Sequence, residues 1–111
     1  MLRGFLLINK SSGPTSHDAV DQLRQITGLK KIGHAGTLDP LAEGLLIVAV
    51  GREATKQIKQ FVKLDKEYLA DIQLGLTTDS YDRLGKIISQ YQGQPIEKGE
   101  IDKIIGKFIG Q

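Results

Sequence analysis

The chain contains no cysteine and no tryptophan, and only two of its 111 residues are histidines. Without cysteine there can be no disulfide framework and no thiolate metal site, which fits a reducing compartment. His17 and His34 lie far apart in sequence, so they do not indicate a zinc site. We therefore expect neither a disulfide nor a bound metal.

Long hydrophobic runs are also lacking. The N-terminal apolar stretch, FLLI at residues 5–8, is far too short for a signal peptide or a membrane span. A composition of 40% hydrophobic and 25% charged residues is typical of an ordinary folded domain. These features predict a cytoplasmic protein with no membrane partner.

The charge is spread unevenly along the chain. Residues 1–60 carry eight Lys and Arg against five Asp and Glu, a net charge of +3, whereas residues 61–111 carry seven against eight, a net charge of −1. A mildly basic N-terminal half is compatible with a phosphate-backbone partner, and ordinary solvated lysines explain it equally well.

Hydrophobic periodicity predicts strands alternating with helices. Apolar runs or alternation predict strands at residues 4–8, 45–50, 68–74 and 86–91. The strongest signal lies at 68–74, where four residues alternate on one face: Tyr68, Ala70, Ile72 and Leu74. Apolar residues at helical spacing predict a helix that includes residues 19–26 and another at 101–108, and a short helical stretch is expected at about 54–62. This order predicts the α+β class, with a mixed, mainly antiparallel sheet flanked by helices.

Local polar residues predict where the first helix begins and ends. Thr15 or Ser16 can cap its N-terminus, and Asp18 in the first turn complements the helix dipole. Gly28 is a suitable C-terminal stop.

A glycine-rich loop, residues 33–44, is the candidate for chemistry. Its glycines allow a ligand to approach the backbone closely, and Pro40 favours an extended conformation at Asp39. An ionised Asp held there is a ready nucleophile or base. The alternative is ordinary Asp-Pro turn chemistry, and a neutral, backbone-satisfied imidazole is the commoner state for His34. The Lys-Ser/Thr pair of a phosphate-binding P-loop is absent.

Three separated motifs resemble the TruB family, the tRNA pseudouridine-55 synthases of the bacterial type. The catalytic segment of that family is similar to residues 33–56, GHAGTLDPLAEGLLIVAVGREATK. Its N-terminal motif is similar to residues 4–20, GFLLINKSSGPTSHDAV, although the usual Lys-Pro is here Lys10-Ser11. A third motif resembles residues 66–87, and residues 108–111, FIGQ, look like the beginning of a later one.

The resemblance implies an enzyme that isomerises uridine to pseudouridine at position 55 in the T arm of tRNA, without a cofactor. Asp39 matches the family's catalytic carboxylate. Tyr68 matches the ring that packs on the target uracil, where core packing is the alternative, and His34 matches the histidine that enters the RNA loop. Possible contacts to RNA phosphate are Lys10, Lys30 and Lys31, for which solvated lysines are an equal alternative.

The resemblance also implies that residues 1–111 are the N-terminal part of a catalytic domain. In the family, the arginine that pairs with the Asp, a second tyrosine and the C-terminal RNA-binding domain come later. We therefore expect little activity from these 111 residues alone, and a monomer at full length. Two alternatives remain open: a non-catalytic RNA-binding or tRNA-chaperone module, and a hydrolase that pairs Asp39 with Glu43.

Overall fold

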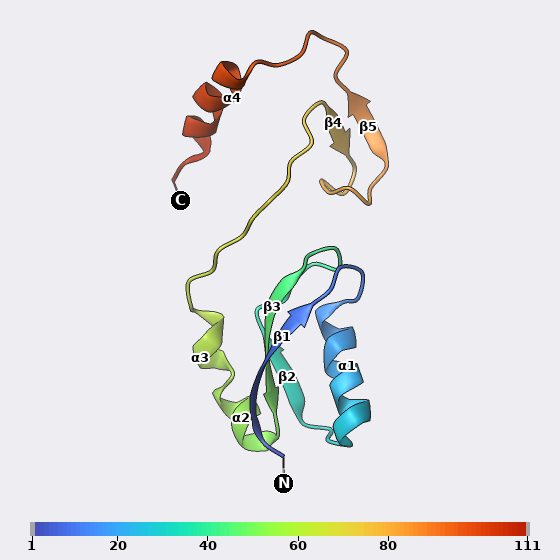
Figure 1. Ribbon diagram of the computed structural model, residues 1–111, viewed down its shortest axis with the longest axis vertical. Coiled ribbons are helices and arrows are strands. Elements are labelled where there is room, and N and C mark those ends of the chain that lie inside the picture. The colour runs from blue at the N-terminus through green and yellow to red at the C-terminus, as the bar shows by residue number, and fades with distance from the viewer. Residues whose placement is uncertain (1, 111) are drawn as a thin grey trace. The chain divides into compact units, whose positions relative to one another are not determined.

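A computed structural model describes residues 2–110 of the chain (Figure 1). These residues divide into two compact units, Met1–Glu67 and Tyr68–Gln111. Both units combine helices with antiparallel strands, so the predicted α+β class with mainly antiparallel pairing is confirmed. Among the described residues, no helix has the length and apolar character needed to cross a membrane.

The first unit is built on a three-stranded antiparallel sheet in the order β1-β3-β2. The predicted strands at 4–8 and 45–50 are confirmed as β1 (Gly4–Lys10) and β3 (Gly44–Val50). The sequence did not predict β2 (Ile32–Ala35), most of which was expected to belong to the glycine-rich loop. β2 is short and contains Gly33, and it is extended because β3 supplies its hydrogen-bonding partner, with Ile32 opposite Val50.

Helix α1 (Ser16–Thr27) begins and ends where the local signals predicted. The Thr15 hydroxyl accepts a hydrogen bond from the Asp18 backbone N–H at 3.0 Å, and the Asp18 carboxylate accepts one from the Thr15 N–H at 2.8 Å. This capping box lowers the pKa of Asp18, with the backbone hydrogen bond from Thr15 as the largest cause. At the other end, Gly28 adopts the left-handed conformation, with φ of 70°.

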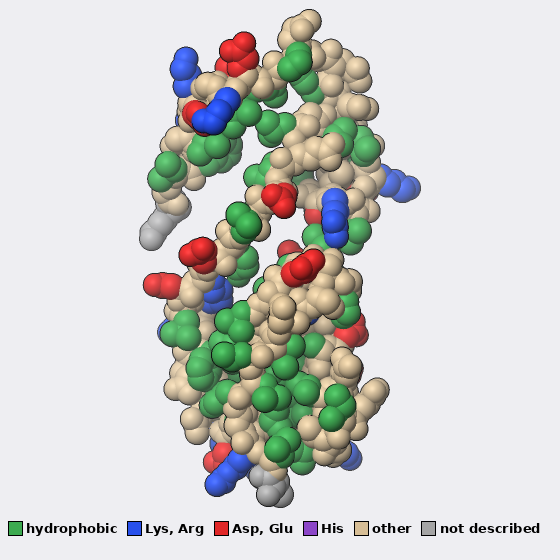
Figure 2. All heavy atoms as spheres, viewed as in Figure 1, with side chains coloured by type: hydrophobic (Ala, Val, Ile, Leu, Met, Phe, Trp, Pro, Cys, Tyr) green, Lys and Arg blue, Asp and Glu red, His purple; other side chains and the backbone are tan. Residues whose placement is uncertain are grey.

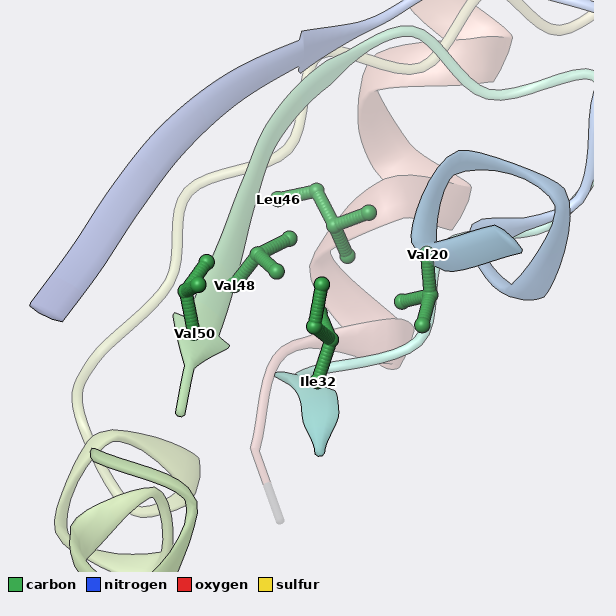
Figure 3. Close-up of a cluster of buried hydrophobic side chains, with 5 residues drawn as sticks. All are labelled: Val20, Ile32, Leu46, Val48 and Val50. Atoms are coloured by element: carbon green, nitrogen blue, oxygen red, sulfur yellow. The ribbon is translucent and has the colours of Figure 1, made fainter. Parts of the chain in front are cut away.

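The core of the first unit lies between α1 and one face of the sheet. In β3, alternate residues point toward α1, so Leu46, Val48 and Val50 meet Val20 of the helix and Ile32 of β2 (Figure 3). All five side chains are buried. The side of β3 that faces α1 is therefore fully buried, whereas Leu45 on the other face is 60% exposed, so the continuous apolar run does not mean burial on both faces.

Two short helices cover part of the opposite face, α2 (Arg52–Gln57) and α3 (Lys59–Val62), where one helix was predicted. The Phe61 ring packs on Phe5 of β1, with ring centroids 4.7 Å apart. Leu7 and Leu45 on the same sheet face stay exposed. Hydrophobic side chains are correspondingly visible on the surface of this unit in Figure 2.

The second unit contains a hairpin of β4 (Leu76–Thr78) and β5 (Ile87–Gln90), followed by helix α4 (Lys98–Ile105) and a 3₁₀ turn, η1 (Gly106–Phe108). The predicted strand at 86–91 is therefore confirmed as β5. The predicted C-terminal helix is also present, but its α-helical part begins three residues earlier and its last turn is 3₁₀.

The predicted strand at 68–74 is wrong. Residues 65–73 have no regular secondary structure, and the side chains of Leu69 and Ile72 are 99% and 79% exposed. Alternation shows which face of a strand would be buried, but a strand also needs a hydrogen-bonded neighbour. Within the described part of the chain, the only partner of β5 is β4, which begins at Leu76.

Gly51, which joins β3 to α2, gives a test of this fold. Its φ of 87° and ψ of 159° lie in a region open almost only to glycine, and an added Cβ would lie 3.2 Å from the Arg3 Cβ. We expect Gly51→Ala to lower the free energy of unfolding by about 1–3 kcal/mol in urea titrations. Gly33→Ala is the control, because its Cβ would meet only Thr55 at 3.9 Å. Equal stabilities of the two variants would contradict this account.

Candidate active site

Asp39 lies in the loop between β2 and β3, which the structure places at residues 36–43. Its side chain is exposed, and its backbone carbonyl accepts a hydrogen bond from the Ala42 N–H at 2.9 Å, which closes a turn. Within the first unit, residues 2–67, no Lys, Arg or His forms an ion pair with the Asp39 carboxylate. The carboxylate is therefore open to an incoming ligand.

The residue before Asp39 is fixed by the first residue of α1. The Ser16 hydroxyl accepts a hydrogen bond from the Leu38 N–H at 2.9 Å and donates one to the Leu38 carbonyl at 3.1 Å. Ser16 is only 2% exposed, and the Leu38 side chain packs against the buried core cluster. Leu38 is thus held by its backbone and by its side chain.

The residue after Asp39 is fixed by the turn that follows β1. The Pro40 carbonyl accepts hydrogen bonds from the Gly13 N–H at 2.7 Å and from the Lys10 ammonium at 3.0 Å. Lys10 also donates to the carbonyls of Ser11 and Pro14, each at 2.7 Å. The Lys10 side chain therefore links the turn that follows β1 to the loop that contains Asp39.

This geometry argues against the predicted phosphate contact by Lys10. The residue is only 3% exposed, and three carbonyls accept from the three N–H groups that an ammonium offers. Its positive charge is buried, and the cost of burial is offset by these charge-assisted hydrogen bonds.

His34 lies in β2, opposite Val48, two residues before the loop begins. It is half-buried, and its Nδ1 is buried with no hydrogen-bond partner among residues 2–110, contrary to the expected backbone-satisfied imidazole. Burial lowers the pKa of His34, and the positive charge of His17 lowers it further. The imidazole is therefore held in its neutral form more strongly than a free histidine.

The two remaining lysine candidates lie away from the loop. Lys30 and Lys31 are exposed and precede β2, so the length of that strand, about 13 Å, separates them from the Asp39 loop. Tyr68 begins the second unit and is 69% exposed, so its ring is not packed in a core there. The predicted RNA contacts of these residues stay predictions.

Sequence reasoning missed the structural role of Ser16 and Gly13 in this site. Ser16 was expected only as a possible helix cap, a task that Thr15 performs. No local pattern links Ser16 to Leu38, because 22 residues separate them. In the described part of the chain, no group of three His, Asp or Glu side chains could share a metal ion.

Comparisons with known proteins agree on one family. The model of the TruB family pseudouridylate synthase N-terminal domain matches residues 24–111. A tRNA pseudouridine synthase B from Protochlamydia amoebophila is 54% identical over 80% of this chain and 34% of its own length. Another from Geotalea uraniireducens is 44% identical over 97% of this chain and 34% of its own length. The chain thus spans about a third of the length of these relatives.

A solved structure of an H/ACA RNP bound to a substrate RNA containing 2′-deoxyuridine also contains a similar chain. That chain is 42% identical over 51% of this one and 18% of its own length, with a TM-score of 0.49.

The variant Lys10→Met tests whether the hydrogen bonds of Lys10 hold these two loops together. The variant leaves the carbonyls of Ser11, Pro14 and Pro40 without their shared donor, so we expect the free energy of unfolding to fall by more than about 1.5 kcal/mol. The exposed Lys31→Met is the control and should stay within about 0.5 kcal/mol of the wild type. Urea unfolding measures both, and equal losses would show that the hydrogen bonds of Lys10 do not hold the loop.

The lowered pKa of His34 leads to a prediction of how the stability of the fold depends on pH. Its pKa is lower in the folded than in the unfolded state, so its contribution to stability is present above the ordinary value of 6.5 and is lost as pH falls below it. We expect the melting temperature to drop between pH 7.5 and 5.5, and His34→Gln to reduce that drop. His17→Gln is the control and should keep most of it, because burial is the larger cause of the His34 shift. An identical drop in the wild type and His34→Gln would contradict the assignment.

Proposed function

Since the chain belongs to the TruB family of pseudouridylate synthases, we propose that it carries the catalytic carboxylate of an enzyme that isomerises uridine to pseudouridine in tRNA. The observation that carries this proposal is the state of Asp39. Its carboxylate is exposed and has no ion pair within the first unit, residues 2–67, while hydrogen bonds hold the residues on both sides of it. A nucleophile needs this combination of a fixed position and open access.

The proposed reaction needs no redox partner. The bond between N1 of uracil and C1′ of ribose breaks, the base turns, and C5 bonds to C1′. The proton that leaves C5 is balanced by the one that N1 gains, so no electrons are gained or lost overall. In this proposal the Asp39 carboxylate acts as the nucleophile: it forms a transient bond to the target nucleotide, this bond breaks again before pseudouridine leaves, and no cofactor takes part.

We propose the uridine at position 55 in the T arm of tRNA as the target. The support is the family and the names of the relatives, which are tRNA pseudouridine synthases B. A uridine within a folded loop must be extruded before it can react, and aromatic faces commonly support extruded bases. Tyr68 would supply such a face and His34 would enter the RNA loop. Lys30 and Lys31, both exposed, would contact phosphate, and the reaction would take place in the cytoplasm.

The rest of the site would come from beyond residues 1–111. The relatives are about three times as long as this chain, and an Asp nucleophile benefits from a paired cation that the first unit, residues 2–67, does not supply. We therefore propose that the 111-residue chain alone turns over little RNA. We also propose that the full-length protein acts as a monomer.

A chimera tests the function. This chain replaces the matching third of the Geotalea protein, and pseudouridine formation is measured in a T-arm stem-loop RNA together with RNA binding. We expect conversion by the wild-type chimera, and Asp39→Asn should bind RNA equally well but convert it more than about 10³-fold more slowly. Glu43→Gln is the matched control, because it removes another exposed carboxylate from the same loop.

The same assay separates the competing functions. Equal conversion by the wild type and Asp39→Asn would make Asp39 a structural turn residue. A folded wild-type chimera that binds the RNA but leaves the uridine unchanged would favour the RNA-binding or chaperone module. A loss with Glu43→Gln as large as that with Asp39→Asn would point to a shared two-carboxylate mechanism.

A further inference from the structure

The Ser16 hydroxyl satisfies both backbone groups of Leu38. It accepts from the N–H and donates to the carbonyl, which belongs to the peptide bond that joins Leu38 to Asp39. One side chain thereby fixes the orientation of the peptide unit immediately before the proposed nucleophile. The contact spans 22 residues, so it links α1 to the loop directly.

The other side of Asp39 is fixed independently. The Pro40 carbonyl is held by Gly13 and Lys10, and the Pro40 ring restricts the backbone of Asp39 itself. Asp39 therefore sits between two fastened residues. Because no hydrogen bond or ion pair of the first unit, residues 2–67, holds its carboxylate, the contacts that position Asp39 within this unit act on the backbone beside it.

Two neighbouring hydroxyls at the start of α1 perform different tasks. The Thr15 hydroxyl caps the helix by accepting from the Asp18 N–H at 3.0 Å. The Ser16 hydroxyl, although it belongs to the same turn, is buried and directed to the loop. The Thr15 hydroxyl is therefore used in capping the helix, whereas the buried Ser16 hydroxyl forms hydrogen bonds with Leu38.

We propose that Ser16 is a positioning residue for Asp39. Ser16 acts by fixing the Leu38 peptide and touches no substrate itself. This inference rests on the proposed function, in which Asp39 is the nucleophile. A displacement of a reacting group by about 1 Å can slow a reaction by about 10²-fold. Loss of the Ser16 hydroxyl should therefore slow the chemical step and leave RNA binding intact.

The test compares Ser16→Ala with Thr15→Ala in the same chimera. Both variants remove one hydroxyl from the start of α1, but only Ser16→Ala breaks the link to Leu38. We expect kcat to fall by about 10- to 100-fold in Ser16→Ala with KM unchanged, and by less than about threefold in Thr15→Ala. Melting temperatures of both variants establish that they remain folded at the assay temperature.

Hydrogen exchange provides a readout that does not depend on turnover. We expect exchange of the Leu38 amide, measured in the same proteins, to accelerate more than about tenfold in Ser16→Ala, because its acceptor is gone. Thr15→Ala should leave it near the wild-type rate. Unchanged protection of Leu38 in Ser16→Ala would overturn the proposed link.

The outcomes separate this inference from the function on which it rests. A folded wild-type chimera that does not convert the uridine would overturn both. A wild type that converts it, with equal kcat in Ser16→Ala and Thr15→Ala, would overturn the positioning role alone. A raised KM with unchanged kcat in Ser16→Ala would also overturn it, since Ser16 would then serve RNA binding.

Discussion

The buried ammonium of Lys10 is the interaction on which the loop around Asp39 depends. A charge that is only 3% exposed is tolerated because three carbonyls accept its hydrogen bonds, and they belong to Ser11, Pro14 and Pro40. To satisfy that charge, the segment after β1 must curl back on itself and the Asp39 loop must lie against it. The glycine-rich loop between β2 and β3 could adopt many conformations by itself, and the hydrogen bonds of Lys10 restrict it to one position at the end of the sheet.

The loop is supported by the better-packed side of the first unit. Leu38 packs against the cluster between α1 and the sheet, and Ser16 belongs to α1. The opposite sheet face, where Leu7 and Leu45 are exposed, contributes nothing to the hydrogen bonds that hold the loop. The position of Asp39 therefore follows from the α1 side of this unit, and changes on the other sheet face should reach it only through overall stability.

Local signals in the sequence predicted α1 and β3, but they did not show that residues 54–62 belong to two helices. A cap at Thr15 or Ser16 with Asp18 in the first turn predicted the start of α1, and continuous apolar residues predicted β3. Non-local pairing was not predictable: β2 is a strand because β3 lies beside it, whereas residues 68–74 alternate correctly but find no partner strand within residues 2–110. Asp39 was singled out by family resemblance, and the contacts that fix its neighbours cross 22 or more residues.

Asp39 is positioned by hydrogen bonds to the backbone of its two neighbours, and this arrangement suits the chemistry proposed for its carboxylate. A carboxylate that is held in place by hydrogen bonds to its own oxygens has fewer lone pairs free to attack a substrate. Here the fastening atoms are the backbone groups of Leu38 and Pro40, so the position is fixed while both Asp39 oxygens remain open. A serine and a lysine from another segment accordingly fix the position of Asp39 without occupying either carboxylate oxygen.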